Sequence, residues 1–248
     1  MLTSFLVALQ FLSIVRIRRT LPFDDTTLGR AGAFFPAVGL LLGGVVCAVD
    51  WMFSLLAAPT LTNVLVVVAL AVLSRGLHLD GVADSADGLC GGTDVQRRLA
   101  IMKDSRIGTF GALALLLVVL VKLRALDLLV GEVRTLALLL SPMLGRWSCV
   151  LMAAAAPPAR ADGLGAMFIR GVRWRECALA GGFTLLVSSG FAGGASLAFC
   201  AAVTGAALGF TRYCTRRLGG VTGDTMGAVG EVSETAALCL FTLLSRGS

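Results

Sequence analysis

The sequence contains little charge and only one histidine. Of its 248 residues, 15% are charged and 57% are hydrophobic, and the mean hydropathy is +0.89. Soluble domains average roughly 25% charged residues, so an ordinary soluble domain is excluded. A single histidine, together with seven cysteines that form no C-x-x-C pair, excludes a typical zinc site. Most of these cysteines lie in apolar runs, where we expect them to be small buried hydrophobes.

Several familiar motifs are also missing. There is no G-x-x-x-x-G-K-[ST], so a P-loop is not predicted. The formal charge of +6 is spread over loops, and no basic run is interleaved with aromatic residues, so nucleic acid is not an expected partner. The apolar run 4–15 is followed, not preceded, by Arg16, Arg18 and Arg19, which is not the order of a signal peptide. We expect it to remain as a short apolar helix.

Long apolar segments make up most of the rest. They are rich in glycine and alanine, which allow close packing of helices in a membrane. We predict an all-α, polytopic transmembrane helix bundle, a single integral-membrane domain over residues 1–248, with about seven spans besides the short N-terminal helix. The predicted spans lie at residues 31–57, 61–76, 107–130, 134–156, 177–192, 195–213 and 233–245.

Basic residues concentrate in alternate loops. The loops 57–62 and 190–195 carry no charge. Because cytoplasmic loops are enriched in arginine and lysine, we expect the basic loops on the cytoplasmic side. Lys122 and Arg124, near the end of a predicted span, are expected to extend toward the membrane surface. The basic loops are 16–30, 77–106, 157–176 and 212–232.

The second basic loop contains three aspartates within a stretch of eight residues. Asp80, Asp84 and Asp87 follow an i, i+4, i+7 spacing, which on a helix places them within about 60° of one another. Such a carboxylate cluster predicts a bound cation, and hard oxygen ligands favour Mg²⁺ shared with substrate phosphates. The alternative is a solvated acidic helix end. Gly88 would let the backbone approach a phosphate closely.

A second polar block follows at residues 101–111. Lys103 and Arg106 have the chemistry to neutralise phosphate oxygens. Asp104 either ligates metal or orients Arg106. Ser105 is expected to cap a helix beginning near Ile107, whose N-terminus would attract an anion. The alternative is a charged cap at the membrane boundary.

A third block, residues 219–234, is a glycine-rich turn that leads into an apolar helix. Asp224, Glu231 and Glu234 add three carboxylates on the same predicted side, and we expect them as further metal ligands. Glu231 and Glu234 are spaced i, i+3 and share a helix face. The alternative is an acidic first turn that is favoured by the helix dipole.

Two further residues stand out by position. His78 precedes Asp80 by two residues and is either a general base, a substrate contact or a structural group. Arg146 lies inside an apolar segment, where it either reaches the polar site or pairs with a buried acid.

Carboxylates for Mg²⁺, cations for phosphate and a membrane-boundary position together favour phosphoryl transfer. A cation-coupled transporter is a different possibility, but it predicts acids near the middle of the spans rather than at their ends.

The sequence resembles a known family along essentially its whole length. The stretches His78–Gly88 and Ile101–Gly111 look like its two signature motifs, and residues 219–234 look like its C-terminal pattern. Ala8–Leu12 and the Phe35–Gly39 region are similar too. This is the cobalamin synthase family of adenosylcobinamide-GDP ribazoletransferases.

The resemblance implies a multi-pass protein of the bacterial inner membrane, surrounded by lipid, with its active site facing the cytoplasm and Mg²⁺ as cofactor. It implies that adenosylcobinamide-GDP and α-ribazole, or α-ribazole 5′-phosphate, are joined to adenosylcobalamin or its phosphate with release of GMP. A homo-oligomer is left open.

These implications suggest roles for the polar residues. Asp80, Asp84 and Asp87 would hold Mg²⁺ with Asp104 or Asp224. Lys103 and Arg106 would neutralise charge on the transferred phosphoryl group. A carboxylate or His78 would take the proton of the attacking hydroxyl.

One stretch also resembles another family. Residues 84–88 look like part of the CDP-alcohol phosphotransferase motif D-x-x-D-G-x-x-A-R. This chain has Gly91 and Gly92 where that motif has alanine and arginine, and such an enzyme is the alternative function.

Overall fold

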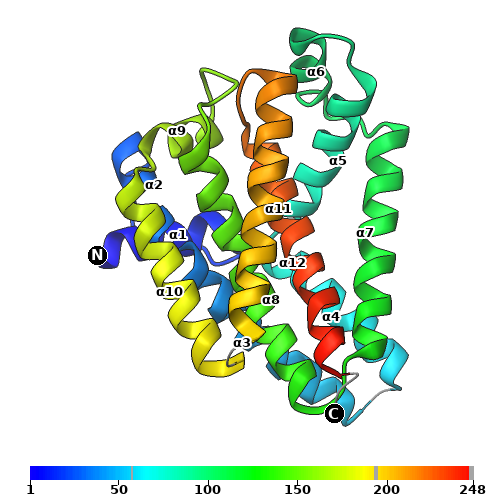
Figure 1. Ribbon diagram of the computed structural model, residues 1–248. Coiled ribbons are helices and arrows are strands. Elements are labelled where there is room, and N and C mark those ends of the chain that lie inside the picture. Colours follow the sequence, from blue (N-terminus) through cyan, green and yellow to red (C-terminus); the bar gives the residue numbers. More distant parts are fainter. Residues whose placement is uncertain (57, 193–194, 246–248) are drawn as a thin grey trace.

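A computed structural model describes residues 1–56, 58–192 and 195–245. Within these residues the chain is almost entirely helical (Figure 1), and one isolated backbone bridge joins Pro158 to Val221. The elements are α1 (Leu2–Leu12), α2 (Asp25–Ala31), the 3-10 helix η1 (Gly32–Phe34), α3 (Phe35–Ser54), α4 (Pro59–Leu73), α5 (Leu77–Gly91), α6 (Val95–Ile101), α7 (Thr109–Leu128), α8 (Gly131–Ala155), α9 (Leu164–Gly171), α10 (Trp174–Ala192), α11 (Ala195–Leu218) and α12 (Gly223–Ser245).

The predicted all-α membrane bundle is confirmed. Among the described residues, five helical stretches are long and apolar enough to cross a membrane, and the bent pair α4–α5 is a sixth if it counts as one span. The five are Asp25–Ser54, Thr109–Leu128, Gly131–Ala155, Leu197–Leu218 and Gly223–Leu244. Helix α10, which we expected to span, is not among them, because Arg175 and Glu176 near its start lower its hydropathy.

Helix α8 lies at the centre of the bundle and contacts α3, α10, α11 and α12. Its contacts are close because glycines face it. A Cβ on Gly39 of α3 would collide with the backbone at Pro142, and one on Gly145 of α8 would lie 2.7 Å from the carbonyl oxygen of Gly230 on α12. The abundant glycines therefore serve helix packing, as expected for a membrane bundle.

The chain bends by 86° between α4 and α5. Arg75 and Gly76 have φ values of 56° and 68°, in the left-handed region. Glycine adopts this region readily, whereas it is uncommon for other residues. Glycine at position 76 therefore suits the short non-helical link that produces the bend. The bend turns α5, which carries the three aspartates, away from the direction of α4.

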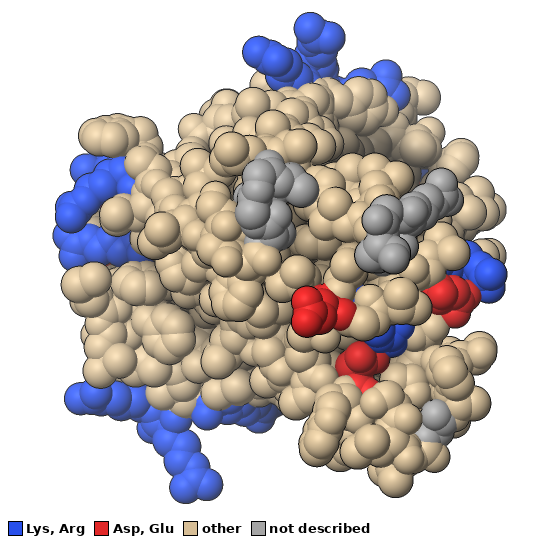
Figure 2. All heavy atoms as spheres, turned by 60° about the horizontal axis from the view of Figure 1, so that its bottom comes forward, with Lys and Arg blue, Asp and Glu red and all other residues tan. Residues whose placement is uncertain are grey.

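Segments of three of the four predicted basic loops lie at one end of the molecule. Helices α6 and α9 and the α11–α12 turn, all from predicted basic loops, lie at the upper end in Figure 1. Figure 2 looks toward the opposite end, which is largely uncharged apart from a few acidic and basic side chains. There Arg134 pairs with Asp50, and Arg124 with Asp127.

One helix boundary differs from expectation. Helix α12 begins at Gly223, ten residues before the predicted span at 233, because residues 223–234 are helical and directly follow the glycine-rich turn. Asp224, Glu231 and Glu234 therefore all lie within α12. Helix α7 begins at Thr109, close to the predicted start near Ile107.

Candidate active site

The crossing of α5 and α12 brings separated carboxylates together. A Cβ on Gly81 would lie 2.5 Å from the backbone oxygen of Asp224, and one on Gly227 would lie 3.2 Å from that of Leu77. These two glycines therefore let the helices approach backbone to backbone. As a result, Asp84 on α5 lies within electrostatic range of Asp80 and of Asp224.

The predicted helical stacking of Asp80, Asp84 and Asp87 on α5 is confirmed. Their surroundings nevertheless differ. Asp80 is exposed and Asp84 half-buried, whereas Asp87 is only 8% exposed. Asp80 and Asp84, with Asp224 from α12, form the group that we call the carboxylate site.

A cation that the sequence reasoning did not single out joins the carboxylate site. Arg160 donates to Asp224 over 2.9 Å and to the carbonyl oxygen of Leu99 over 3.2 Å. The bridge between Pro158 and Val221 holds the Arg160 loop against the turn before α12. In the sequence Arg160 is one of several loop arginines, and no motif distinguishes it.

Asp87 has a structural role that spacing did not predict. Its two carboxylate oxygens accept the backbone N–H groups of Gly108, over 2.7 Å, and of Gly111, over 2.8 Å. A side chain on either glycine would collide with this carboxylate. Asp87 therefore occupies the N-terminus of α7, where we expected a phosphate and expected Ser105 as the cap. Ser105 is exposed and does not cap this helix.

Gly88 also differs from its predicted role. It is buried against α6, and a Cβ there would collide with the side chain of Met102 and approach the carbonyl oxygen of Arg98. The small residue is required for packing of α5 on α6, and the expected approach to a phosphate is corrected accordingly.

The loop between α6 and α7 presents its cations to solvent. Arg106 donates to both oxygens of Asp104, with its Nη2 atom 2.7 Å from Oδ2. This pairing lowers the pKa of Asp104 to about 2. Of the two roles expected for Asp104, the structure shows the pairing with Arg106, and the role of metal ligand stays a prediction. Lys103 is exposed.

Glu231 and Glu234 face away from the carboxylate site into the bundle, where they form a buried ion cluster. Lys122 of α7 pairs with both glutamates, and Arg146 of α8 pairs with Glu234. Lys122, Arg146 and Glu234 have side chains that are 2% exposed. In this arrangement Lys122 and Arg146 neutralise the two acids, and the role of metal ligand expected for them stays a prediction. Lys122 does not extend to the surface, and Arg146 takes the buried pairing of its two alternatives.

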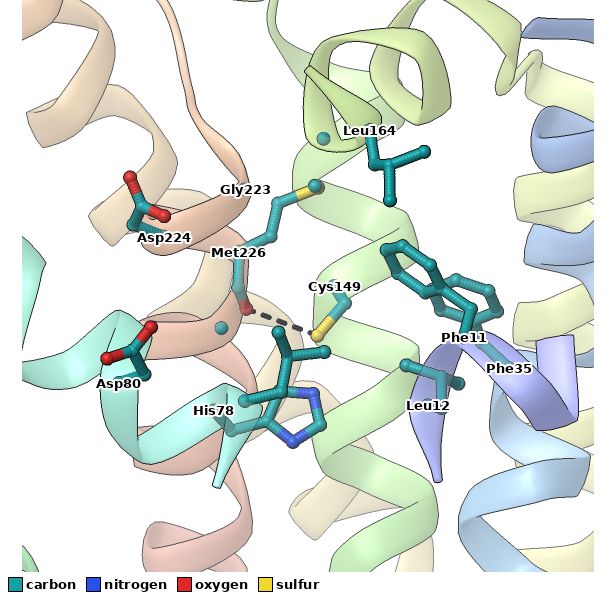
Figure 3. Close-up of a pocket in the computed structure, with 13 residues that line it drawn as sticks. Phe11, Leu12, Phe35, His78, Asp80, Cys149, Leu164, Gly223, Asp224 and Met226 are labelled. Carbon is teal, nitrogen blue, oxygen red and sulfur yellow. Dashed lines mark hydrogen bonds between the residues drawn. The ribbon is translucent and has the colours of Figure 1, made fainter. Parts of the chain in front are cut away.

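A cavity of about 210 Å³ lies beside the carboxylate site. Figure 3 shows Asp80 and Asp224 together on one side of it and Phe11, Leu12 and Phe35 on the other. His78 is 2% exposed and lines the cavity. It points toward the apolar walls rather than toward Asp80 (Figure 3), so its surroundings are not those of a base shared with the aspartates.

The donor set of the carboxylate site suits a hard cation. Asp80, Asp84 and Asp224 offer only oxygen ligands, the type that Mg²⁺ prefers. In the described part of the chain, however, no group of three His, Cys, Asp or Glu side chains is arranged to hold an ion by itself. The residues therefore fit an ion that takes part of its coordination from phosphate or water. With Arg160 beside them, they can position and neutralise a phosphorylated ligand.

Comparisons with known proteins agree over the whole chain. Residues 4–242 match the family model for cobalamin-5-phosphate synthase. A protein of Geotalea daltonii named adenosylcobinamide-GDP ribazoletransferase is 38% identical over 250 residues, covering 100% of this chain and 99% of the relative. Relatives with the same name from Roseiflexus sp. and Syntrophobacter fumaroxidans are each 41% identical, covering 95% and 97% of this chain and 88% and 100% of their own.

No solved structure matches the chain. The family match and the relatives each extend from the first helices to the last, so they include the carboxylate site, the α6–α7 loop and the buried ion cluster. The chain therefore belongs to the cobalamin-5-phosphate synthase family.

Proposed function

We propose that this chain is an adenosylcobinamide-GDP ribazoletransferase that acts in a late step of cobalamin biosynthesis. A hydroxyl of α-ribazole, or of its 5′-phosphate, attacks the phosphorus next to the cobinamide. The new P–O bond forms as the bond to the GMP phosphate breaks. The products are adenosylcobalamin, or its phosphate, and GMP. The names of the relatives and the carboxylate site support this reaction.

One observation carries the proposal. The tight crossing of α5 and α12 joins two of the predicted aspartates to Asp224, although the two elements are more than 130 residues apart in sequence. Asp80 and Asp224 line a cavity of about 210 Å³, and Asp84 lies within electrostatic range of both. The three acids therefore form one group beside a space that a ligand can enter.

We propose Mg²⁺ as the cofactor, with Asp80, Asp84 and Asp224 as its protein ligands. When bound, it would supply positive charge to the pyrophosphate and to the leaving phosphate. Mg²⁺ usually keeps waters and phosphate oxygens among its ligands, so a site with few carboxylates is adequate for it.

The chain's own residues then perform the remaining tasks. Arg160, held by Asp224, binds a phosphate oxygen. Lys103 and Arg106 are exposed on the α6–α7 loop. They bind a phosphate of the GDP moiety as the substrate arrives from solvent. Asp80 or Asp84 takes the proton of the attacking hydroxyl. Phosphoryl transfer needs little more than such positioning and charge neutralisation.

The site is proposed to face the cytoplasm from a bacterial inner membrane. Helices α6 and α9 and the α11–α12 turn, all from basic loops, lie at the upper end in Figure 1, and Asp224 of the carboxylate site directly follows that turn. Such a gathering of basic loops at one end is typical of the cytoplasmic side. Phosphorylated nucleotide substrates are soluble and would reach the site from that side.

The test is release of GMP by the purified protein in lipid nanodiscs. With adenosylcobinamide-GDP and α-ribazole we expect GMP in the presence of Mg²⁺ and none after its removal by chelation. Release of CMP from a CDP-alcohol instead would identify the alternative phosphotransferase. Uptake of substrate into vesicles without any GMP would contradict both enzymes and indicate a transporter.

A further inference from the structure

The cavity beside the carboxylate site has a divided lining. Phe11, Phe35 and Leu164 lie with other apolar residues on one side, and the carboxylates of Asp80 and Asp224 lie on the other (Figure 3). Pockets of this kind bind ligands that have an apolar body and a polar end, with the few polar groups fixing orientation.

His78 is the polar group inside the apolar part. It is 2% exposed, and its Nδ1 atom is buried without a hydrogen-bond partner. Within the described residues, its imidazole forms no hydrogen bond to the protein. Buried polar side chains nearly always have partners. His78 lines the cavity without one, which indicates a ligand with a matching polar atom.

The size of the cavity limits that ligand. A cavity of about 150 Å³ accommodates benzene, and sites for drug-sized molecules begin near 300 Å³. At about 210 Å³ the cavity fits one small aromatic ring system. A corrin macrocycle is far too large for it, so the corrinoid substrate must lie outside.

We propose that this cavity binds the aromatic base of the acceptor nucleoside, and that an N–H of His78 donates a hydrogen bond to the free ring nitrogen of that base. The assignment rests on the proposed function, in which the acceptor is ribazole, a riboside of a benzimidazole. Stacking of the ring against Phe11 and Phe35 leaves the ribose at the polar side. Its hydroxyls then lie at Asp80 and Asp224, where the attack is proposed.

This assignment makes His78 a specificity-determining residue rather than the general base. The base ring and its nitrogen would be recognised within the apolar cavity, apart from the phosphates. The carboxylates alone would accept the proton of the attacking hydroxyl.

The decisive experiment changes the ligand and the residue together. The full chain in nanodiscs is assayed with benzimidazole riboside and with indole riboside, which has C–H in place of the free ring nitrogen. For the unmodified protein we expect the KM for indole riboside to be about tenfold higher. In His78→Phe we expect the KM for benzimidazole riboside to rise about tenfold and the preference between the two to vanish. These factors are typical of one hydrogen bond to a buried partner.

The KM for adenosylcobinamide-GDP is the internal control and should change less than about twofold. A merely structural role of His78 would alter the KM of both substrates or kcat alone. If His78→Phe keeps the full preference for benzimidazole riboside, the proposal is overturned.

A second variant tests the cavity without touching His78. Leu164 is 49% exposed at the rim, so Leu164→Trp should narrow the cavity without disturbing the core, and Leu186→Trp, at a 75% exposed position on α10, is the matched control. Equilibrium dialysis measures binding of benzimidazole riboside alone, without turnover. We expect Leu164→Trp to weaken this binding at least fivefold and Leu186→Trp to leave it unchanged. Equal binding by both variants would contradict the assignment.

The two readouts separate the inference from the proposed function. If the protein releases no GMP but binds the riboside saturably, and Leu164→Trp weakens that binding, the proposed function is contradicted and the binding site is supported. If the protein releases GMP but neither His78→Phe nor Leu164→Trp changes recognition of the riboside, the function is supported and the binding site is contradicted.

Discussion

Helix α12 carries acids of two kinds within eleven residues. Asp224, in its first turn, is 25% exposed, and its cationic partner is the loop residue Arg160. Glu234, less than three turns further on, is 2% exposed and pairs with Lys122 and Arg146. The carboxylate site keeps more acids than cations, whereas the buried ion cluster has equal numbers of each.

This difference separates function from structure. A charge inside a membrane bundle is costly unless it is neutralised, so the acids and cations of an internally balanced cluster compensate one another. An excess of negative charge at a partly open site is unfavourable by itself and becomes favourable when a cation or a positively charged complex binds. The same residue type on one helix thus serves two purposes.

The largest effect is expected for a substitution in the carboxylate site. Asp84→Asn removes one charge from the carboxylate site, so we expect GMP release to fall on the order of 10³-fold while the protein still inserts and unfolds normally. The measurements are GMP release at saturating substrates and the midpoint of thermal unfolding in detergent. Activity within tenfold of normal would contradict the assignment of the site.

For the buried ion cluster we expect a substitution to lower the stability of the protein. Glu234→Gln leaves the charges of Lys122 and Arg146 only partly compensated, and we expect a loss of about 3–5 kcal/mol in the free energy of unfolding. Glu132→Gln, at an exposed acid, is the control and should change stability by less than about 0.5 kcal/mol.

A double substitution sharpens the same test. Lys122→Met with Glu231→Gln removes one charge of each sign and keeps the cluster neutral. It should therefore be less destabilising than Lys122→Met alone. A larger loss in the double variant would show that charge balance is not what the cluster provides.

Asp87 is intermediate, since it lies on the helix of the carboxylate site but bonds like a structural group. Asp87→Ala leaves the N–H groups of Gly108 and Gly111 without their acceptor, and we expect a loss of about 1–3 kcal/mol in unfolding free energy. Asp87→Asn retains one acceptor and should cost less. If both variants unfold normally but lack activity, Asp87 belongs with the metal ligands after all.

The smallest effect is expected at Asp104. Its pKa of about 2, below the usual 3.8, means that its pairing with Arg106 contributes stability above about pH 4 that is lost only as the pH falls through 2. Asp104 is therefore ionised throughout the neutral range. The pH profile of GMP release by Asp104→Asn should have the same shape as that of the unmodified protein, and a shifted profile would place Asp104 in the proton transfer.

Much of the bundle could be predicted because its signal is local. The apolar runs and the basic loops follow from composition, and the stacking of Asp80, Asp84 and Asp87 follows from helix period. The number of spans was overestimated because apolarity over residues 177–192 does not reveal the charged start of α10. The start of α12 was missed because the glycines before it suggest a longer turn than the one that forms.

The division of the acids could not be predicted in this way. Lys122 is a candidate for the membrane surface until α7 is seen packed against α12. The N-terminus of α7 is an expected anion site until Asp87 is found to accept the N–H groups of Gly108 and Gly111. Arg160 has no distinguishing neighbours in the chain. Each of these residues obtains its partner from an element at least 20 residues away, and sequence spacing within one helix holds no information about such contacts.

The sequence by itself determined that this is a helical membrane protein with basic loops and with three aspartates on one helix, because hydropathy, charge and helix period are local properties. Its motifs also led to the family. Only the tertiary structure decided which acids are free to act. That choice depends on where glycines let α5, α8 and α12 approach closely, and on which cations the resulting packing brings within reach of each carboxylate.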